Sequence, residues 1–393
     1  MSGGAPTADQ RVGVIGGGIL GVSTAAHLAR LGARVTLITD GALGSGASGR
    51  SLSWLNSFGV RTEAYHRLRL EGIERYHRFR EDRGAGDYIR FDGGLNWTSP
   101  ENVDQQREAF EWMTRAGYPA RWLAPHEVTR FTPGVERDAL PDHGVIFNPT
   151  EGWVELPPLI ATLAREVVDH GGDIVTDAGK ATIAVADGRA RSIVTASGQT
   201  FEVDAAVLAT GADVPRTLAD LGVQVPDATP TGLLVRTKQI DAPLRAVLNT
   251  PRVAVRPTPA GSLVLDADWS EREVTDRHDG TYEVKPETVK GLLREASEVL
   301  AGRPTLPFES YGVGPKPIPG DGEPVLGELD AVAGYFVAFT HSGATLGLIA
   351  GELLAGEIVH ESRHPLLQSF RPTRFGAATS DSRQGMDVAA GAG

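Results

Sequence analysis

Apolar residues near the amino terminus predict a strand, a helix and a second strand in succession. Residues 11–16 form a short apolar run that ends in glycine, as a buried strand does. Residues 19–31 carry leucine and alanine at helical spacing, and residues 34–39 are again short, apolar and β-branched. A β-α-β unit implies a parallel sheet, so further strands must come from later in the chain.

The remaining hydrophobic pattern indicates more helices and a mixture of strand types. Helical spacing recurs at residues 64–83, 98–116, 156–171 and 343–359. Strands at 174–185, 191–196 and 200–203 alternate with turn residues, as in an antiparallel meander. Further strands are expected at 205–209, 232–238, 253–256, 262–267 and 335–339. Strand–helix pairs near both ends bracket a more antiparallel middle, which indicates one domain built from distant segments with a second domain inserted.

The composition is that of a folded, acidic protein. The chain has 393 residues, which suits two domains, and 41% hydrophobic against 22% charged residues provide for a sizeable core. The 38 Lys and Arg residues against 50 Asp and Glu residues give a net charge of −12, which disfavours binding to nucleic-acid phosphates. Cysteine is absent, which excludes disulfides, iron–sulfur clusters, cysteine nucleophiles and a cofactor tethered through sulfur.

The hydropathy of the chain and the sequence of its amino terminus indicate where in the cell the protein is found. No apolar run reaches the ~20 residues needed to span a bilayer, and the amino terminus has no basic start followed by an apolar stretch. We therefore expect a cytoplasmic protein without a membrane span. Residues 1–10 and 376–393 are small, polar and glycine-rich, and we expect both to be disordered tails. No H-x-x-x-H or H-E-x-x-H pattern occurs, so no histidine metal site is predicted.

The strongest single motif is a G-x-G-x-x-G that follows the first strand and opens the first helix. Gly16 permits a tight turn, Gly18 lets the backbone approach a pyrophosphate, and Gly21 allows the helix to pack closely on the strand. The helix start at Ile19 and Leu20 presents N–H groups that hold phosphates. The motif predicts a dinucleotide site; an ordinary glycine-rich turn is the structural alternative.

The residue at the position that usually binds the adenosine ribose departs from the dinucleotide-binding motif. At the end of the second strand, where an acidic residue usually accepts the ribose hydroxyls, the chain has Thr39, and Asp40 comes next. Either Asp40 reaches round to the ribose or the Thr39 hydroxyl serves instead.

Several further segments carry a family resemblance. They are GSGASG at 44–49, ATGA at 209–212, KPIPGDGEP at 316–324, THSG at 340–343 and FRPTRF at 370–375. In this order they resemble the motifs of the FAD-dependent amine oxidoreductases, the family of D-amino-acid oxidase, glycine oxidase and sarcosine oxidase. The matches extend from residue 11 to residue 375, and their number and order are more specific than any one of them.

The resemblance implies an α/β fold: a discontinuous Rossmann-type FAD-binding domain with an inserted α+β substrate domain on a mixed or antiparallel sheet. It places the FAD-binding domain at 11–85, 145–230 and 308–375, and the substrate domain at 86–144 and 231–307. The implied contacts to FAD are Gly16, Gly18, Ile19, Leu20, Gly21, Thr39, Asp40, Ser45, Ala47, Ser48, Lys180, Thr210, Gly211, Gly343, Ala344, Thr345 and Leu346.

The resemblance also implies a reaction. A non-covalent FAD would take a hydride from an amine at flavin N5, and the resulting imine would hydrolyse to a carbonyl compound and an amine or ammonia. The start of the helix at 343–359 would stabilise the negative charge of the reduced flavin. Oxygen is the expected electron acceptor, which would give hydrogen peroxide.

Four residues are candidates for the substrate site. Lys316 lies where family members that oxidise amino acids often carry an arginine that grips the substrate carboxylate, and a solvated or structural role is the alternative. Arg50 is a candidate anion anchor, and His341 is either an acid/base or a loop residue beside the flavin. Asp266 would favour a cationic substrate if it faced the pocket; otherwise it is a surface acid near a turn. We expect a larger secondary amine or amino acid rather than glycine or sarcosine.

Val264 departs from the sarcosine oxidases, which place there a lysine that helps to activate oxygen. A quinone or protein acceptor therefore remains open. So do a non-autonomous FAD subunit of a hetero-oligomeric amine dehydrogenase and a nicotinamide-dependent dehydrogenase, and the oligomeric state is not predicted. The Tyr65/His66 and Tyr76/His77 pairs lie on a strongly charged helix, and we expect them at the solvated surface.

Overall fold

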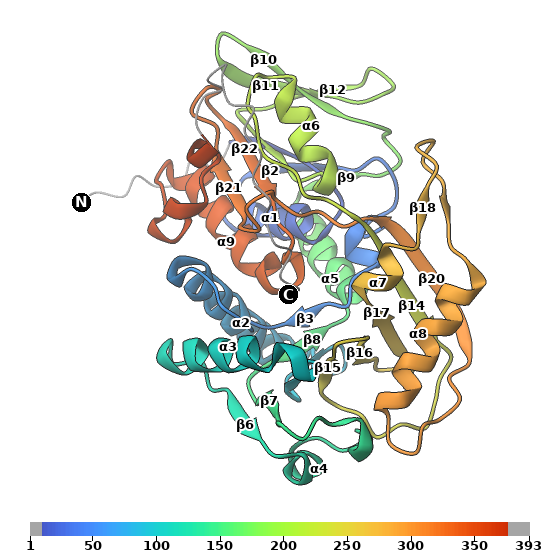
Figure 1. Cartoon of the computed structure of the whole chain (residues 1–393). Helices are drawn as coiled ribbons and strands as arrows, with labels where there is room; N and C mark the ends of the chain where they lie inside the picture. Colours follow the sequence, from blue (N-terminus) through green and yellow to red (C-terminus); the bar gives the residue numbers. More distant parts are fainter. Residues whose placement is uncertain (1–9, 376–393) are drawn as a thin grey trace, which may run out of the picture. The chain divides into compact units, whose positions relative to one another are not determined.

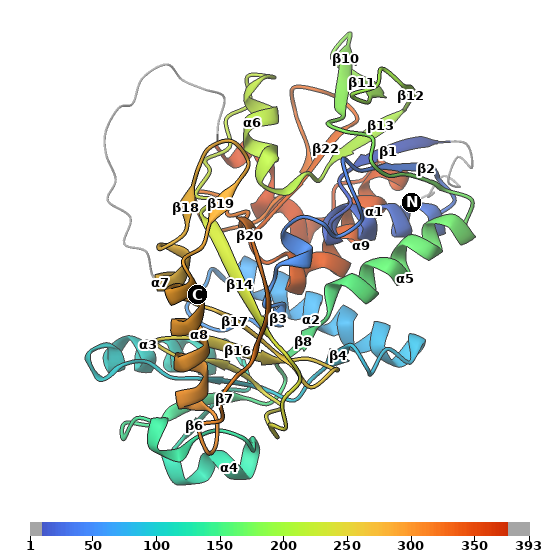
Figure 2. The same cartoon turned by 90° about the vertical axis from the view of Figure 1, so that its right-hand side faces the viewer.

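A computed structural model describes residues 10–375, so the predicted tails lie outside the described residues except for Gln10. The chain divides into two compact units (Figures 1 and 2). Within the described residues, the first unit contains residues 10–49, Leu156–Pro230 and residues 315–375. The second contains Arg50–Glu155 and Thr231–Gly314. Residues 50–85, 145–155 and 308–314 thus belong to the second unit, whereas the sequence placed them with the FAD-binding domain.

The first unit is built on a six-stranded sheet with the order β21-β22-β13-β1-β2-β9. All neighbours pair in parallel except β21 and β22, which are antiparallel. This is the strand order of a doubly wound nucleotide-binding fold with an antiparallel edge strand. The strands are β1 (Arg11–Ile15), β2 (Arg34–Ile38), β9 (Asp173–Val175), β13 (Ala205–Leu208), β21 (Val325–Glu328) and β22 (Tyr335–Phe339).

Helices cover one face of this sheet and a small antiparallel meander covers the other (Figure 1). The covering helices are α1 (Ile19–Arg30), α5 (Leu156–Asp169) and α9 (Gly343–His360), and a short α6 spans Val214–Ala219. The meander consists of β10 (Thr182–Ala186), β11 (Arg189–Val194) and β12 (Thr200–Glu202). A Cβ at Gly13 of β1 would overlap Ile193 of β11, so the meander packs directly on the central strand.

The predicted strand at 174–185 is wrong as a single element. Its first part is β9, which extends the parallel sheet beside β2, and its last part is β10 of the meander. Between them Asp177 and Gly179 have positive φ angles of 54° and 62°. A left-handed conformation at two neighbouring positions breaks a strand, and period-2 hydrophobicity alone did not show it.

The second unit is built on an eight-stranded mixed sheet with the order β20-β14-β17-β16-β15-β5-β7-β6. From β14 to β6 the pairings are antiparallel apart from β5 and β15, which run parallel. The strands are β5 (Gly94–Asn96), β6 (Arg121–Leu123), β7 (Val145–Asn148), β14 (Thr231–Thr237), β15 (Val247–Asn249), β16 (Ala254–Pro257), β17 (Leu263–Asp266) and β20 (Phe308–Pro315).

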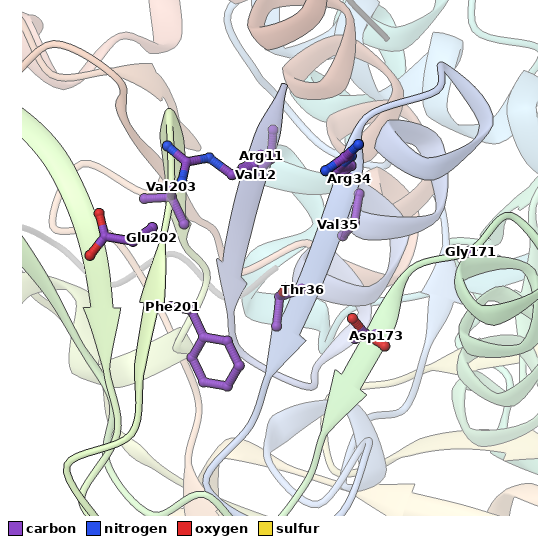
Figure 3. Close-up of a pocket in the computed structure, with 10 residues that line it drawn as sticks. All are labelled: Arg11, Val12, Arg34, Val35, Thr36, Gly171, Asp173, Phe201, Glu202 and Val203. Carbon is purple, nitrogen blue, oxygen red and sulfur yellow. The ribbon is translucent and has the colours of Figure 1, made fainter. Parts of the chain in front are cut away.

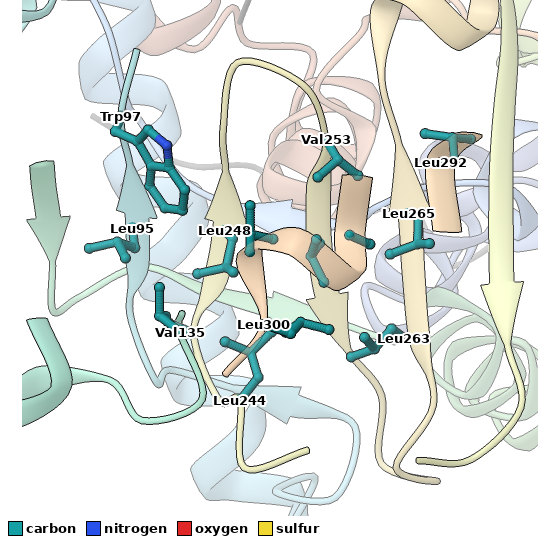
Figure 4. Packing of buried hydrophobic residues seen from close by; sticks show 14 of the residues in the cluster. Leu95, Trp97, Val135, Leu244, Leu248, Val253, Leu263, Leu265, Leu292 and Leu300 are labelled. Carbon is teal, nitrogen blue, oxygen red and sulfur yellow. The ribbon is translucent and has the colours of Figure 1, made fainter. Parts of the chain in front are cut away.

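One face of this sheet is apolar and packs against α8 (Pro286–Val299), a helix that the sequence analysis did not predict (Figure 4). Leu263 and Leu265 of β17 lie in this cluster with Val253 and Val255. Side chains alternate between the faces of a strand, so the residues between these lie on the opposite face. We call that opposite face the inner face of the sheet.

The rest of the second unit consists of helices and a second, smaller sheet. The order of the smaller sheet is β3-β8-β4, and a hairpin is formed by β18 and β19. The bounds are β3 (Trp54–Leu55), β4 (Ile89–Arg90), β8 (Gly152–Val154), β18 (Thr275–Asp276), β19 (Tyr282–Glu283), α2 (Glu63–Arg83), α3 (Val103–Arg115), α4 (Val128–Phe131) and α7 (Asp268–Glu271). Helix α2 begins where the Thr62 side chain accepts a hydrogen bond from the Tyr65 amide and ends at left-handed Gly84.

Candidate cofactor and substrate sites

The predicted glycine turn forms a close-packed cradle at the carboxyl end of β1. Gly16 has φ 127°, and a Cβ there would collide with the carbonyl oxygen of Ala209. A Cβ at Gly21 would in turn collide with the carbonyl oxygen of Gly16. Both positions therefore need glycine, the first for backbone conformation and both for space. Gly18 stands at the N-cap of α1 and has no side chain that could cover the helix start.

The segment 44–49 wraps around this cradle. The Gly44 amide donates to the carbonyl oxygen of Gly17 at 2.9 Å, and the Ile19 amide donates to Ser48 Oγ at 3.0 Å. Ser48 thus joins the turn to the start of α1. This contact brings the two motifs together in space, with Ser45 exposed and Ala47 partly exposed in the same turn.

The end of β2 lies beside the cradle. Thr39 is 2% exposed, and its hydroxyl would be 2.6 Å from a Cβ at Gly17. Asp40 is exposed, 3.5 Å from the Thr39 hydroxyl. The segment after β9 crosses this strand end, since the Ala178 amide donates to the Thr39 carbonyl oxygen at 3.0 Å, and exposed Lys180 follows. The buried Thr39 and the outward Asp40 make Asp40 the more accessible partner for a ribose.

The start of α9 meets the start of α1. A Cβ at Gly343 would lie 3.5 Å from the Ile19 side chain, so two helix N-termini with their partial positive charges converge at one edge of the sheet. Ala344 and Thr345 continue the first turn of α9. The Leu346 amide already donates to the Ser342 carbonyl oxygen at 2.9 Å and its side chain is fully buried, so Leu346 offers no polar group to a cofactor.

The ends of β13 and of the KPIP segment lie at the same edge. The buried Thr210 Oγ1 lacks a hydrogen-bond partner within residues 10–375, and Gly211 has φ 61° with Pro317 3.4 Å from its Cβ position. The Lys316 amide donates to the Pro230 carbonyl oxygen at 2.9 Å, which holds this segment against Pro230. Lys316 is half-buried and His341 is exposed. An orphaned hydroxyl, a glycine cradle and two converging helix starts fit the pyrophosphate and ribose groups of FAD.

In the second unit, Arg50 lies along β20, where two glycines make room for it. A Cβ at Gly312 would be 2.7 Å from Arg50 Cγ, and one at Gly314 would be 2.6 Å from Nη2. Burial lowers the pKa of Arg50, and the nearby Tyr282 phenol on β19 opposes that shift. The Arg50 side chain thus packs on β20 of its own unit with the Tyr282 phenol nearby, and its role as an anion anchor stays a prediction.

Asp266 lies on the inner face of the eight-stranded sheet, because Leu265 beside it lies in the apolar cluster. It is partly exposed, and it is opposite Ala254 in the register of β16 and β17. Val264 lies on the same face and is fully buried.

A buried polar cluster in the second unit was not found from the sequence. Glu151 is fully buried and accepts a hydrogen bond from the Tyr118 hydroxyl at 2.7 Å, which in turn accepts one from the Ser57 amide at 2.8 Å. Ser57 Oγ lies 2.7 Å from His66 Nδ1. Burial raises the pKa of Glu151 to about 8 despite the opposing charges of Arg69 and Arg61. The same desolvation lowers the pKa of His66.

The predicted surface position of the Tyr65/His66 and Tyr76/His77 pairs is therefore wrong. Tyr65 is 3%, His66 5% and Tyr76 0% exposed, and His77 stacks on Phe91 with the ring centres 3.6 Å apart. Helix α2 is covered on a wide face by residues distant in sequence. The charged residues between the pairs obscured that face, and aromatic residues at helical spacing were the available signal.

One open hollow in the first unit lies away from the cradle. It measures about 370 Å³ and is lined at the amino ends of β1 and β2 by Arg11, Val12, Arg34 and Thr36 (Figure 3). Arg11 is paired with Asp204 at 2.8 Å. Among the described residues, no group of three or more His, Asp and Glu side chains could hold a metal ion. Nor does any helix within residues 10–375 have the length and apolar character needed to cross a membrane.

The strand order, the glycine cradle and the converging helix starts define a dinucleotide-binding fold with a second, mixed-sheet unit. Residues 11–357 match the family model described as FAD dependent oxidoreductase, and the chain belongs to this family. The resemblance, the fold class and the FAD cofactor expected from the sequence are thereby confirmed, and the chain is an FAD-dependent oxidoreductase.

Alignments with known proteins cover nearly the whole chain. The glycine oxidase of Geobacillus kaustophilus (strain HTA426) is 25% identical over 378 residues, which are 92% of this chain and 96% of the relative. The crystal structure of glycine oxidase from Geobacillus kaustophilus superposes with a TM-score of 0.78 at 23% identity, covering 93% of this chain and 99% of that one. The L-amino acid deaminase of Proteus myxofaciens reaches a TM-score of 0.80 at 20% identity, with 95% of each chain covered. The two structural likenesses show the fold.

Proposed function

We propose that the protein oxidises the C–N bond of an amine or amino acid that carries a carboxylate. Bound FAD would supply the two-electron chemistry, by accepting at N5 a hydride from the carbon beside a neutral amine nitrogen. Water would then hydrolyse the imine to a carbonyl compound and an amine or ammonia, and oxygen would reoxidise the flavin and give hydrogen peroxide. The protein's part is to bind the cofactor, orient the amine and stabilise negative charge.

The observation that carries this proposal is the convergence of the α1 and α9 starts at the glycine cradle. The start of α1 suits the pyrophosphate. The start of α9 supplies a second region of positive potential, which favours a reduced, anionic ring system. Relatives named glycine oxidase and L-amino acid deaminase support an amino compound as substrate.

Lys316 is the proposed anchor for the substrate carboxylate in the first unit. Its amide is fixed to Pro230, and its neighbour Pro317 rests on Gly211 at the end of β13. An ammonium group binds a carboxylate as a point charge, without the paired hydrogen bonds of an arginine. Because this contact is weaker than that of an arginine, further groups of the chain can contribute to binding the carboxylate.

The test is an anaerobic visible spectrum of the purified holoprotein before and after addition of amines. Amino acids and N-alkyl amino acids are paired with the amines that lack their carboxylate, such as sarcosine with dimethylamine. We expect a yellow protein that is bleached by carboxylated amines. Bleaching by none would refute the proposal and favour a non-autonomous electron-transfer subunit.

The role of Lys316 is tested by Lys316→Ala, with exposed Lys290→Ala on α8 as the matched control. We expect Lys316→Ala to raise the KM for carboxylated amines about 10- to 100-fold, since a hydrogen-bonded charge is lost. Lys290→Ala should behave as the wild type. Equal effects of Lys316→Ala on both members of an amine pair would exclude it as a carboxylate anchor.

A further inference from the structure

The inner face of the eight-stranded sheet is unlike the face that packs against α8. The α8 side carries leucine, valine and phenylalanine, and it is a closed apolar cluster. The inner face of the same strands carries asparagine and arginine, although much of it is equally buried: Asn96 is 6%, Asn148 1% and Arg256 1% exposed. Burying polar groups on a sheet face is costly unless they have partners.

Two arginines stand in one row of this face. In the strand register Arg236 of β14 is opposite Val264 of β17, and Val264 is opposite Arg256 of β16. Directly opposed residues share a face, and neighbouring strands lie about 4.8 Å apart. The two arginines therefore flank Val264, each one strand away from it.

Arg256 is held rigidly. Its Nη1 donates to Glu155 Oε1 at 2.9 Å and to the Pro257 carbonyl oxygen at 3.1 Å, and its guanidinium lies over the Trp153 ring, 5.2 Å from the centroid. Its Nε is buried and lacks a hydrogen-bond partner in the described part of the chain. Desolvation lowers the pKa of Arg256, and Glu155 opposes that shift. The guanidinium is oriented with one donor still unsatisfied.

Arg236 is held only loosely. Its Nη2 lies 3.8 Å from Glu155 Oε2, beyond hydrogen-bond distance, and its side chain is 32% exposed. Glu155 is thus one carboxylate shared between two guanidiniums, and the three groups carry a net charge of about +1. An uncompensated positive charge at a mostly desolvated place favours an additional anion.

Other buried donors lie on the inner face at β5 and β7, or on β8 of the smaller sheet. Asn96 Nδ2, Asn148 Nδ2 and Trp153 Nε1 are buried and lack a hydrogen-bond partner among residues 10–375. Asp266 lies in the next row of the face, opposite Ala254, and the charges that act on Arg256 are those of Glu155 and Arg236. The row that contains the two arginines is therefore positive, and the ring of Trp153, whose Nε1 is unsatisfied, lies against Arg256.

We propose that Arg236 binds a carboxylate of the substrate on this face, with Arg256 and Glu155 as the residues that position it. The inference rests on the proposed function and names its substrate class: anionic amines, not the cationic amines that Asp266 alone suggested. A guanidinium offers two parallel N–H groups that match the two oxygens of a carboxylate. Arg236 is the mobile partner that can turn from Glu155 to a ligand.

The experiment uses the holoprotein and two readouts. In the first, anaerobic flavin reduction gives KM and kcat for carboxylated amines and for their uncarboxylated partners. The variants are Arg236→Gln, Arg236→Lys and the control Arg252→Gln, an exposed arginine that pairs with Glu295 at 3.1 Å. Arg236→Gln should raise KM for carboxylated amines about 10- to 100-fold with little change for uncarboxylated ones, and Arg236→Lys should recover part of this loss.

The second readout is calorimetric titration with propionate and with uncharged propionamide, which needs no turnover. The wild type should bind propionate more tightly than propionamide, and Arg236→Gln should remove that difference. If no amine reduces the flavin but this propionate result holds, the proposed function fails and the anion site stands. If propionate binding depends on Lys316 and is unchanged in Arg236→Gln, or if Arg252→Gln has the same effect, the anion site is refuted.

Discussion

Glu151 should make the stability of the protein fall as pH rises through neutrality. The carboxyl group is fully buried in the second unit, between the Tyr118 hydroxyl at 2.7 Å and the Trp54 indole. Burial raises its pKa from 4.5 to about 8, even though these hydrogen bonds and the charges of Arg69 and Arg61 act in the other direction. Desolvation therefore outweighs them, and the folded protein holds a proton there at neutral pH.

The sign and size of this change in the free energy of unfolding follow from proton linkage. Between the unfolded pKa of 4.5 and the folded pKa of about 8, the folded state binds a proton that the unfolded state has released. Its contribution to stability is fully present below the unfolded pKa and is lost as pH rises through the folded value. The free energy of unfolding should fall by about 1.4 kcal/mol per pH unit in this window, or about 4 kcal/mol in total between about pH 5 and pH 8.

The substitution Glu151→Gln removes this titration while keeping the shape and the oxygen that accepts from Tyr118. Urea unfolding is measured at several pH values for the wild type, for Glu151→Gln and for Glu309→Gln, an exposed glutamate on β20. The stability of Glu151→Gln relative to the wild type should improve by about 4 kcal/mol from about pH 5 to pH 8, and Glu309→Gln should run parallel to the wild type. Parallel profiles for all three proteins would refute the buried, protonated carboxyl.

Two further predictions concern the first unit. In Gly21→Val the new side chain collides with the Gly16 carbonyl oxygen, so the purified protein should lose most of its FAD; the flavin-to-protein absorbance ratio measures this, and a normal ratio would contradict the cradle. In Arg371→Met the buried Glu357, 3% exposed, loses the guanidinium that pairs with it, and the free energy of unfolding should fall by about 3–5 kcal/mol. Adding Glu357→Gln should restore much of that loss in urea unfolding; no recovery in the double variant would contradict the ion-pair explanation.

The cofactor cradle could be predicted from the sequence because its requirements are local. A strand, three glycines at fixed spacing and a helix place the backbone by themselves, and Gly16 and Gly21 occur where a Cβ cannot fit. The segments that complete the cradle, from Ser48 to Gly343, were found by their family resemblance. Their convergence needed the parallel pairing of strands that are distant in the chain.

The buried polar groups of the second unit could not be predicted in the same way. His66 lies on a helix whose charged residues hide its buried face, and its partner Ser57 and the more distant Glu151 come from other elements. Arg236 and Arg256 carry no motif. Their common row depends on the register of three strands, which hydrophobic alternation indicates only once Leu263 and Leu265 are known to face α8.

The segments of the two units alternate along the sequence, and this has a consequence for the nascent chain during translation. Helix α1 is packed against α9, and Gly351 of α9 fits so closely over Ser23 that a Cβ there would overlap it. Ser23 precedes Gly351 by 328 residues. At about 5–20 residues per second, a ribosome needs roughly 15 to 65 seconds to span that gap. Throughout this interval the side of α1 that packs against α9 has no partner helix, so the nascent chain should keep this apolar surface exposed until translation is nearly complete.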